Sequence, residues 1–287
     1  MNEFITTNEG LLRLSVFGGV LALMLIMESL FPRKARVQNR LLRVTTNLGI
    51  VVLYTVLMRL IFIFIAIGAA VGVAGFAKQQ GWGVLNVFHL PLWLHIVISI
   101  ILLDMAVYWQ HVASHKIPLI WAFHKMHHAD RDIDATTGIR FHPVEIAFSM
   151  AYKMVIVLIL GPHIIGVILF EIILNGSAMF NHANLRLPLW LDRMVRVLFV
   201  TPDMHRVHHS AIARETNSNY GFNLSVWDRI FGSYIDQPQE GHDDMAIGLP
   251  QYQTDKPSHL LWCLILPFKK NPEKRKPEKK TEGNYHE

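Results

Sequence analysis

Cysteine is almost missing from this chain, which limits the kinds of site that it can hold. Cys263 is the single cysteine among 287 residues, so an internal disulfide framework and a cysteine-rich zinc site are both excluded. A metal ion bound to this protein must therefore be held by imidazole groups, with or without carboxylates.

The motifs of several common enzyme classes are also missing. The sequence contains no H-E-x-x-H, no G-x-S-x-G, no P-loop and no G-x-G-x-x-G. A zincin protease, a nucleophile-elbow hydrolase and a nucleotide-binding enzyme therefore have no support. The Glu-x-x-His pattern of ferritin-like di-iron bundles is absent as well.

Charge is sparse and uneven. Charged residues form 17% of the chain against 52% hydrophobic residues, yet 27 Lys and Arg outnumber 22 Asp and Glu. An apolar chain with a basic excess is typical of an integral membrane protein with positive cytoplasmic loops, rather than of a soluble enzyme or a nucleic-acid binder. No secretory cleavage signal follows the first apolar run, so we expect that run to remain as a membrane anchor.

Four apolar regions predict an all-α integral membrane protein with about four transmembrane helices or helical hairpins and a cytoplasmic, histidine-rich helical cap. These regions are residues 11–31, 47–77, 90–109 and 144–180. The basic loop at 33–43 is expected on the cytoplasmic side. Gly161-Pro162 interrupts the fourth region, and a tight or re-entrant hairpin there would keep the histidines before and after it on one face.

Composition divides the chain into four regions. We expect N-terminal membrane helices and a basic loop at 1–97, a membrane hairpin with a histidine-rich cytoplasmic cap at 98–235, a C-terminal extension at 236–268 and a charged, disordered tail at 269–287. Within the extension, residues 259–268 are apolar but too short to span a membrane. They are expected to lie in the membrane interface or to fill a core.

Histidine is abundant where cysteine is scarce, and the histidines are clustered. The chain has 16 His, and H-x-x-H-H occurs twice, with H-x-x-x-H just before the first copy. The clustered residues are His111, His115, His124, His127, His128, His205, His208 and His209. Residues three or four positions apart share one face of a helix, so each cluster can direct two or three imidazoles to one point.

Two metal ions suit this arrangement better than one, because eight imidazoles exceed the about four to six donors of a single ion. The adjacent residues His127 and His128 diverge by about 100° on a helix, so we predict that each serves a different ion. His182 is a ninth candidate ligand, although a histidine satisfied at the membrane interface is an equally good interpretation of it.

Carboxylates near the clusters are candidates to orient the imidazoles through their second nitrogen. Asp104 lies seven residues before His111, on the same helical stripe and inside an apolar run, where a carboxylate is costly unless it is paired. Four further aspartates flank the two H-x-x-H-H copies and are alternatively solvated loop acids or helix caps, namely Asp130, Asp132, Asp134 and Asp203.

Together, H-V-A-S-H, H-K-M-H-H and H-R-V-H-H, in this order on an apolar chain, resemble the fatty acid hydroxylase/sterol desaturase superfamily. The segments RFHPVE (140–145), NHAN (181–184) and NSNYGFNLSVWDRIFGSY (217–234) match it as well. The resemblance covers about residues 98–235 and implies that this region is a fatty acid hydroxylase-like catalytic domain. It implies a non-haem di-iron centre with the eight clustered histidines as ligands, His182 as a further match and His142 in a supporting role.

The resemblance further implies an oxidoreductase that uses dioxygen to attack an aliphatic C–H bond of a membrane lipid, either a sterol, a fatty acyl chain or a related lipid. A lipid hydroxylase is the leading interpretation, and a desaturase with the same metal centre is the alternative. A membrane metal transporter or sensor is the interpretation from a different class. Zinc can replace iron during purification, since zinc binds imidazole tightly.

An external electron donor is expected, because the chain has no flavin or NAD fingerprint and no cytochrome b5 motif. A ferredoxin or a cytochrome with its reductase would fill this role. We expect a multi-pass protein of a bacterial inner membrane, with the endoplasmic reticulum as the alternative, and an active site on the cytoplasmic side.

Overall fold

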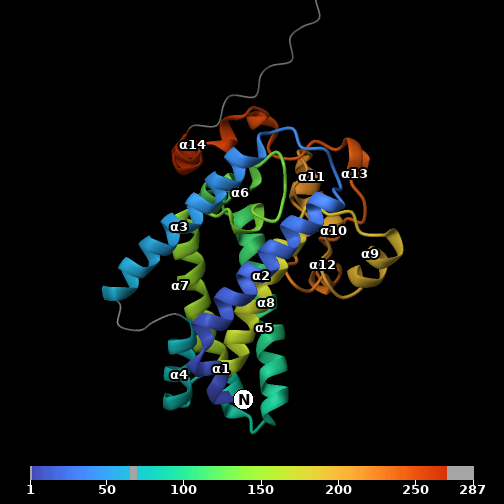
Figure 1. The fold of residues 1–287 in the computed structure, drawn as a ribbon. Coiled ribbons are helices and arrows are strands. Elements are labelled where there is room, and N and C mark those ends of the chain that lie inside the picture. Colours follow the sequence, from blue (N-terminus) through green and yellow to red (C-terminus); the bar gives the residue numbers. More distant parts are fainter. Residues whose placement is uncertain (1, 65–69, 270–287) are drawn as a thin grey trace, which may run out of the picture.

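The protein consists of helices and loops throughout the residues that the structure describes, which are 2–64 and 70–269 of the computed structural model. These two segments contain no β-strand, only isolated bridges. Figure 1 shows long helices that run beneath a cap of short helices and loops. The all-α fold predicted from the apolar runs is confirmed.

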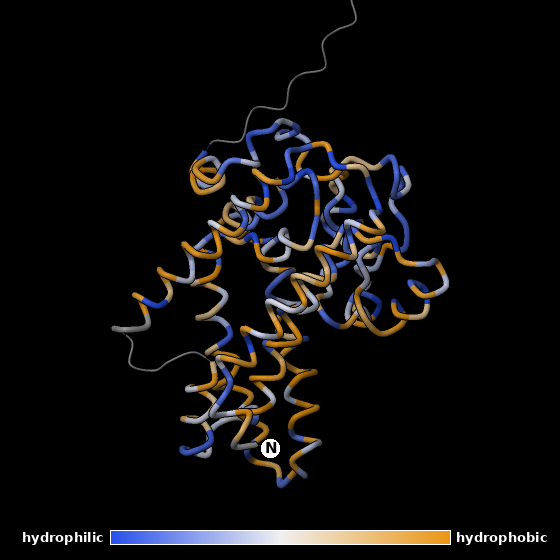
Figure 2. Tube along the Cα trace, viewed as in Figure 1, coloured by the Kyte–Doolittle hydropathy of each residue, from blue (hydrophilic) through white to orange (hydrophobic). Residues whose placement is uncertain are grey.

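Five helices in the described segments are long and apolar enough to cross a membrane. They are α2 (Glu9–Leu30), α3 (Arg40–Phe64), α5 (Leu92–Lys116), α7 (Pro143–Leu160) and α8 (Ile164–His182). Hydrophobic residues, orange in Figure 2, prevail along the long helices, and hydrophilic residues, blue, are frequent in the cap.

The apolar run at 47–77 differs from its prediction as one long span. It contains most of α3 and a separate helix, α4 (Ala70–Gln80), which packs against α7 and α8. Residues 65–69 between α3 and α4 lie outside the described residues.

Helix α5 continues about two turns beyond the span predicted at 90–109. No proline or glycine occurs between this span and Pro118, so nothing stops the helix until α6 (Pro118–His128) begins. His111 and His115 therefore lie in the last turns of a spanning helix, not after it. The helix ends later than the apolar run from which it was predicted.

The break at Gly161-Pro162 is confirmed as the turn between α7 and α8. Gly161 ends α7 in the left-handed conformation, with a φ of 63°, and His163 caps α8 by accepting a hydrogen bond from the backbone N–H of Ile165. A Cβ on Gly161 would lie 2.5 Å from the side-chain nitrogen of Asn86, so only glycine fits. The turn brings the chain back to the cap, as cooperation between the histidine clusters requires.

Short helices build most of the cap. Besides α6 they are α9 (Leu189–Arg196), α10 (Pro202–His208), α11 (Ala213–Thr216), α12 (Val226–Ile230), α13 (Gly241–Asp244) and α14 (Leu260–Ile265). A further short helix, α1 (Asn2–Thr7), precedes α2 at the opposite end of the bundle (Figure 1). Helix α6 packs on the end of α5 and helix α10 on the end of α8, so the cap closes over the ends of two spanning helices.

Helix α14 fills a core with one face and exposes the other. Cys263 and Leu266 are fully buried against Ile50 and Met126, whereas Leu261 is exposed. The expectation that this segment fills a core is confirmed for its inner face. The charged tail predicted to be disordered lies outside the described residues, except for its first residue, Lys269.

The basic loop between α2 and α3 lies against the cap. Arg33 forms an ion pair of 3.1 Å with Asp203 of α10, and the backbone N–H of Val37 donates to Asp132 at 2.9 Å. The loop and the histidine clusters therefore share one side of the helical bundle.

Candidate metal centre

Nine histidines among the described residues converge where the spanning helices meet the cap. Helix α5 supplies His111 and His115, α6 supplies His124, His127 and His128, α8 supplies His182, α10 supplies His205 and His208, and His209 follows as the C-cap of α10. Eight of them expose at most 6% of their surface, and His115 is partly exposed. The structure thus brings together all nine histidines selected from the sequence.

The described histidines form two groups, in each of which one ring nitrogen per residue lies within 4.8 Å of all the others. The first group comprises His111, His115, His124, His128 and His208, and the second comprises His127, His182, His205 and His209. His127 and His128 fall into different groups because neighbouring helical side chains diverge by about 100°. His208 and His209 are divided in the same way. Two adjacent centres suit two ions.

Within the described residues, the inner ring nitrogens face one another and have no hydrogen-bond partner outside the histidine groups. Nε2 of His182 lies 3.1 Å from Nε2 of His127 and 3.0 Å from Nε2 of His205. Neither ring nitrogen of His115 or His209 has a hydrogen-bond partner in the described part of the chain. Buried polar atoms left unpaired are costly, and imidazole suits iron, zinc and copper. The set of donors therefore fits a metal.

The outer ring nitrogens are held by the protein. Nδ1 of His111 donates to the backbone carbonyl of Tyr220 at 2.8 Å, and Nδ1 of His208 donates to that of Ser218 at 2.6 Å. Nδ1 of His182 donates to a carbonyl of its own helix at 2.6 Å. A proton fixed on Nδ1 directs the Nε2 lone pair inward, which is how proteins orient metal-binding histidines.

Glu145 contacts the site directly, although nothing in the histidine spacing points to it. Its Oε1 accepts a hydrogen bond of 2.6 Å from Nδ1 of His124. His142 caps α7 by accepting a hydrogen bond from the backbone N–H of Val144, and its other ring nitrogen donates to the carbonyl of Leu264. His142 thus positions the first turn of α7, from which Glu145 reaches the site. The signal in the sequence was a carboxylate two residues after His-Pro at a helix start.

Burial keeps five histidines of the cap uncharged at neutral pH. The pKa values of His127, His128, His205 and His209 are lowered well below the ordinary value, first by loss of hydration and then by neighbouring imidazoles. Burial lowers the pKa of His208 to about 3. Neutral imidazole is the form that binds metal.

Asp104 does not orient His111 directly, so that expectation is wrong. Its carboxylate accepts hydrogen bonds of 2.8 Å from the indole N–H of Trp227 and from the side chain of Asn223. These bonds fasten α12 and the loop before it to α5. The same loop supplies the Tyr220 carbonyl that holds His111, so Asp104 supports the site through the loop.

Asp203 likewise points away from the nine histidines. It pairs with Arg33 at 3.1 Å and with Arg206 at 3.5 Å, and it lies 3.8 Å from His242. Asp203 therefore does not contact a clustered imidazole, as we expected it to. It joins α10 to the basic loop instead.

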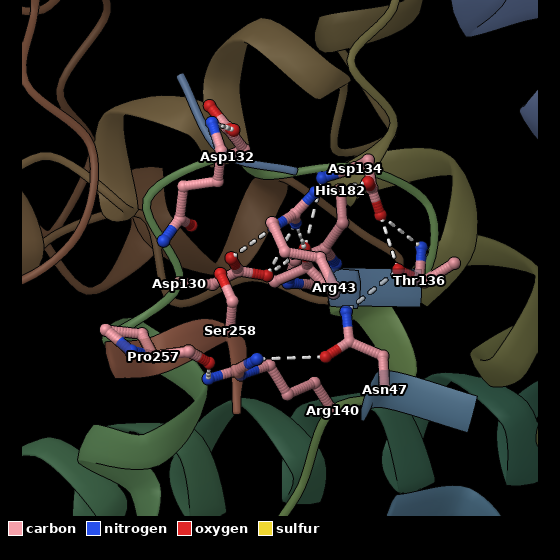
Figure 3. A network of polar contacts seen from close by, with 12 residues as sticks. Arg43, Asn47, Asp130, Asp132, Asp134, Thr136, Arg140, His182, Pro257 and Ser258 are labelled. Atoms are coloured by element: carbon pink, nitrogen blue, oxygen red, sulfur yellow. Dashed lines mark hydrogen bonds and ion pairs between the residues drawn. The ribbon is translucent and has the colours of Figure 1, made fainter. Parts of the chain in front are cut away.

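A buried ion-pair network lies beside the second histidine group (Figure 3). Arg43 donates to both oxygens of Asp130, at 2.8 and 2.7 Å, and to Asp134 at 2.7 Å. All three side chains are at most 1% exposed, so the alternative of solvated loop acids is wrong for both aspartates. Burial raises the pKa of Asp130, but the charges of Arg43 and Arg140 outweigh it and hold this pKa far below its ordinary value.

Arg140 connects this network to the histidines. Its guanidinium donates to Asn47 at 2.9 Å, and its backbone carbonyl accepts from Nδ1 of His127 at 3.3 Å. Asn47 in turn donates to Thr136 at 2.8 Å. Figure 3 shows these side chains gathered between α3 and the loop that follows α6, so α3 helps to place a histidine of the second group.

A cavity of about 460 Å³ adjoins the first histidine group. His111, His124 and Glu145 line it at one end, and Lys153 and Glu171 line it further along the spanning helices. Its walls include the apolar side chains of Ile139, Phe141, Ile146, Met150, Leu174 and Phe222. An elongated, largely apolar ligand fits such a space.

Comparisons with known proteins show which families and relatives this chain resembles. Residues 96–233 match the family model described as fatty acid hydroxylase. The chain is 27% identical over 160 residues to the ornithine lipid hydroxylase OlsE of Rhizobium tropici, covering 55% of this chain and 46% of that protein. It is 26% identical over 163 residues to the alkylglycerol monooxygenase of Homo sapiens, covering 53% and 34%.

A third relative is the very-long-chain aldehyde decarbonylase GL1-11 of Oryza sativa subsp. indica, with 26% identity over 180 residues that cover 61% of this chain and 67% of that protein. The comparison with solved structures gave no match. The chain covers less than half of the length of OlsE and about a third of the alkylglycerol monooxygenase. All nine histidines and Glu145 lie within the matched residues 96–233, so the resemblance seen in the motifs is confirmed.

Proposed function

Since residues 96–233 make this chain a member of the fatty acid hydroxylase family, we propose that it is an oxidoreductase that hydroxylates an aliphatic C–H bond of a membrane lipid with dioxygen. The observation that carries the proposal is the pair of buried histidine groups beside an elongated cavity. The cavity runs between helices that are long and apolar enough to span a membrane, so a lipid can reach the histidines from the bilayer.

Two iron ions are the metals proposed for the two histidine groups, with zinc as a substitute in purified protein. When bound, they supply the oxidation of an unactivated C–H bond by dioxygen, which no amino-acid side chain performs. The Nδ1 hydrogen bonds keep the imidazoles in one orientation, and Glu145 holds the Nδ1 proton of His124. Burial keeps the imidazoles neutral and water away from the site.

Hydroxylation places one oxygen atom of dioxygen in the lipid and reduces the other to water, which consumes two electrons and two protons. We propose a ferredoxin or a cytochrome with its reductase as the separate donor. The basic loop lies on the side of the histidines, which supports a cytoplasmic site under the positive-inside rule. A bacterial inner membrane is preferred, with the endoplasmic reticulum as the alternative.

Catalysis is assigned to residues 98–235, with 1–97 and 236–268 as the membrane anchor and a covering extension. The lipid is a sterol, a fatty acyl chain or a related compound. Two relatives are named for acting on an ornithine lipid and on alkylglycerols, which favours a lipid that combines a polar group with a long chain.

Desaturation with the same metal centre is the alternative reaction, because removal of one hydrogen can start both reactions. The product separates them, since hydroxylation adds oxygen and desaturation removes two hydrogens. A metal transporter is disfavoured. Its ligands are expected near the middle of the membrane, whereas the histidines here stand at helix ends and in the cap.

Lipid mass spectrometry under isotopically labelled dioxygen tests the proposal. Wild type is compared with His127→Ala and His208→Ala, one from each group, and with His259→Ala, an exposed histidine outside both groups. Labelled lipid is expected from wild type and from the control, with a loss of more than about 100-fold in the two ligand variants. Lipid oxidation that persists undiminished in both ligand variants rejects the metal assignment.

A further inference from the structure

The end of the cavity remote from the histidines is charged, although it lies between spanning helices. Glu171 of α8 forms ion pairs with Lys153 of α7 at 2.7 Å and with Arg13 of α2 at 2.6 Å. Glu9 lies 3.9 Å from Arg13. All four side chains line the cavity. Charged groups within a membrane are costly, and those that occur there serve a substrate, an ion or a paired partner.

Among the described residues, this cluster keeps hydrogen-bond donors and an acceptor that its own ion pairs do not use. The two carboxylate oxygens of Glu171 are each taken by one cation. The Lys153 ammonium has three donors, of which Glu171 takes one. The Oε2 atom of Glu9 is buried and, in the described part of the chain, lacks a hydrogen-bond partner. Two cations and two carboxylates cancel in net charge, so the cluster does not select a ligand by a single sign of charge.

Distance separates this cluster from the histidines. Lys153 lies eight positions after Glu145, which contacts His124, and this spacing is a rise of about 12 Å along α7. The walls between the two ends include Ile146 and Met150. The cavity therefore fits a molecule with a charged end and an apolar body.

We propose that Glu9, Arg13, Lys153 and Glu171 bind the zwitterionic head group of a lipid, one that carries an ammonium together with a carboxylate or a phosphate. The anionic group meets Lys153 and the ammonium meets Glu9. The acyl chain then extends toward His124, so oxygen enters the chain and not the head group. This inference rests on the proposed function, because it takes the cavity as the substrate site.

A purely structural role for the cluster makes a different prediction. If the ion pairs only hold α2, α7 and α8 together, their loss weakens the fold and lowers the affinity for every lipid alike. Selective loss for one type of head group requires direct contact with that group.

Equilibrium binding by the full, metal-loaded chain in an uncharged detergent separates the two roles. Five lipids whose hydrocarbon chains have the same length and the same double bond serve as ligands: N-oleoyl-lysine, oleoyl lysophosphatidylethanolamine, oleate, oleylamine and oleyl alcohol. The first two are zwitterions with a carboxylate and a phosphate, and the other three carry an anion, a cation or no charge. The zwitterion that fits is expected to bind at least about tenfold more tightly than the alcohol.

Two variants assign the contacts. Lys153→Met is expected to lower the affinity for the zwitterions and for oleate about tenfold and to leave the affinity for oleylamine and for the alcohol unchanged. Glu9→Gln is expected to lower the affinity for the zwitterions and for oleylamine and to leave the affinity for oleate unchanged. Lys256→Met, an exposed lysine outside the cavity, is the matched control and should change none of the five.

Equal affinity for all five lipids overturns the inference, and so does a Lys153→Met variant that weakens all five equally. Binding needs no turnover, so its outcome is independent of the labelled-oxygen experiment. Selective binding without lipid oxidation would reject the proposed hydroxylation alone, and oxidation without head-group selectivity would reject the head-group site alone.

Discussion

His124 is held by a side chain that lies 21 residues further along the sequence, in another helix. The other Nδ1 hydrogen bonds among the described histidines of the site go to backbone carbonyls, such as those of Tyr220 and Ser218. A carboxylate accepts a stronger hydrogen bond than a carbonyl does, because it carries a full charge. Glu145 therefore gives the first histidine group one ligand that differs from its neighbours.

Replacing Glu145 separates hydrogen bonding from charge. Glu145→Leu removes the acceptor of His124, so metal affinity is expected to fall about 10–100-fold. Glu145→Gln keeps an acceptor oxygen, so its metal affinity should fall less. Chelator competition with metal analysis measures both affinities, and thermal unfolding of each variant checks the fold. Equal metal affinities in the Glu145→Leu variant and in wild type would show that the contact does not support the metal.

Single residues also show where the sequence is a poor guide. Asp104 shares a helical stripe with His111, which made it a reasonable partner, yet it bonds to Trp227 and Asn223. Glu145 belongs to no stripe with His124. Helical spacing reports neighbours within one helix, whereas both of these partnerships join residues of different elements.

At the scale of elements, the ends of helices place the chemistry. Helix α5 brings His111 and His115 to the cap because it runs on to Lys116. The turn at Gly161 sends α8 back so that His182 reaches the second group. The apolar lengths of these helices were readable from the sequence, but the helix end after Trp109 was not, since polar residues continue a helix as well as apolar ones do.

Gly161→Ala tests whether the hairpin turn depends on glycine. The left-handed φ of 63° and the contact of 2.5 Å with Asn86 are expected to lower the free energy of unfolding by about 1–3 kcal/mol. Gly72→Ala is the matched control, because its added Cβ meets nothing within 4 Å and Gly72 lies inside α4. That variant should be neutral or slightly stabilising. Thermal unfolding in detergent compares the two, and equal stabilities would contradict the strain at Gly161.

At the scale of the whole molecule, four helices pack around a site whose buried ring nitrogens would gain partners when metal ions bind. Nine imidazoles from α5, α6, α8 and α10 face one another, and several of their ring nitrogens have no hydrogen-bond partner among the described residues. Metal binding satisfies these nitrogens in the folded chain and not in the unfolded chain, so it should couple to folding.

Metal removal is therefore expected to lower thermal stability. At a metal concentration of about 100 Kd each bound ion adds about 2.7 kcal/mol, which corresponds to a fall in Tm of roughly 5–10 °C for each ion that chelation removes. Wild type should hold two ions per chain by elemental analysis. His128→Ala and His209→Ala, from different groups, should each hold about one, and His259→Ala should hold two. A wild-type protein saturated by one ion would contradict the two-ion arrangement.

The sequence by itself determined the helical class, the membrane character, the hairpin break and the nine histidines. Each of these depends on composition or on spacing within a few residues, which a local pattern records. Tertiary structure decided how the histidines divide into two groups, that Glu145 holds His124 and that Arg43 lies buried between Asp130 and Asp134. These are contacts between residues far apart in the chain, and only the packing of one helix against another brings them together.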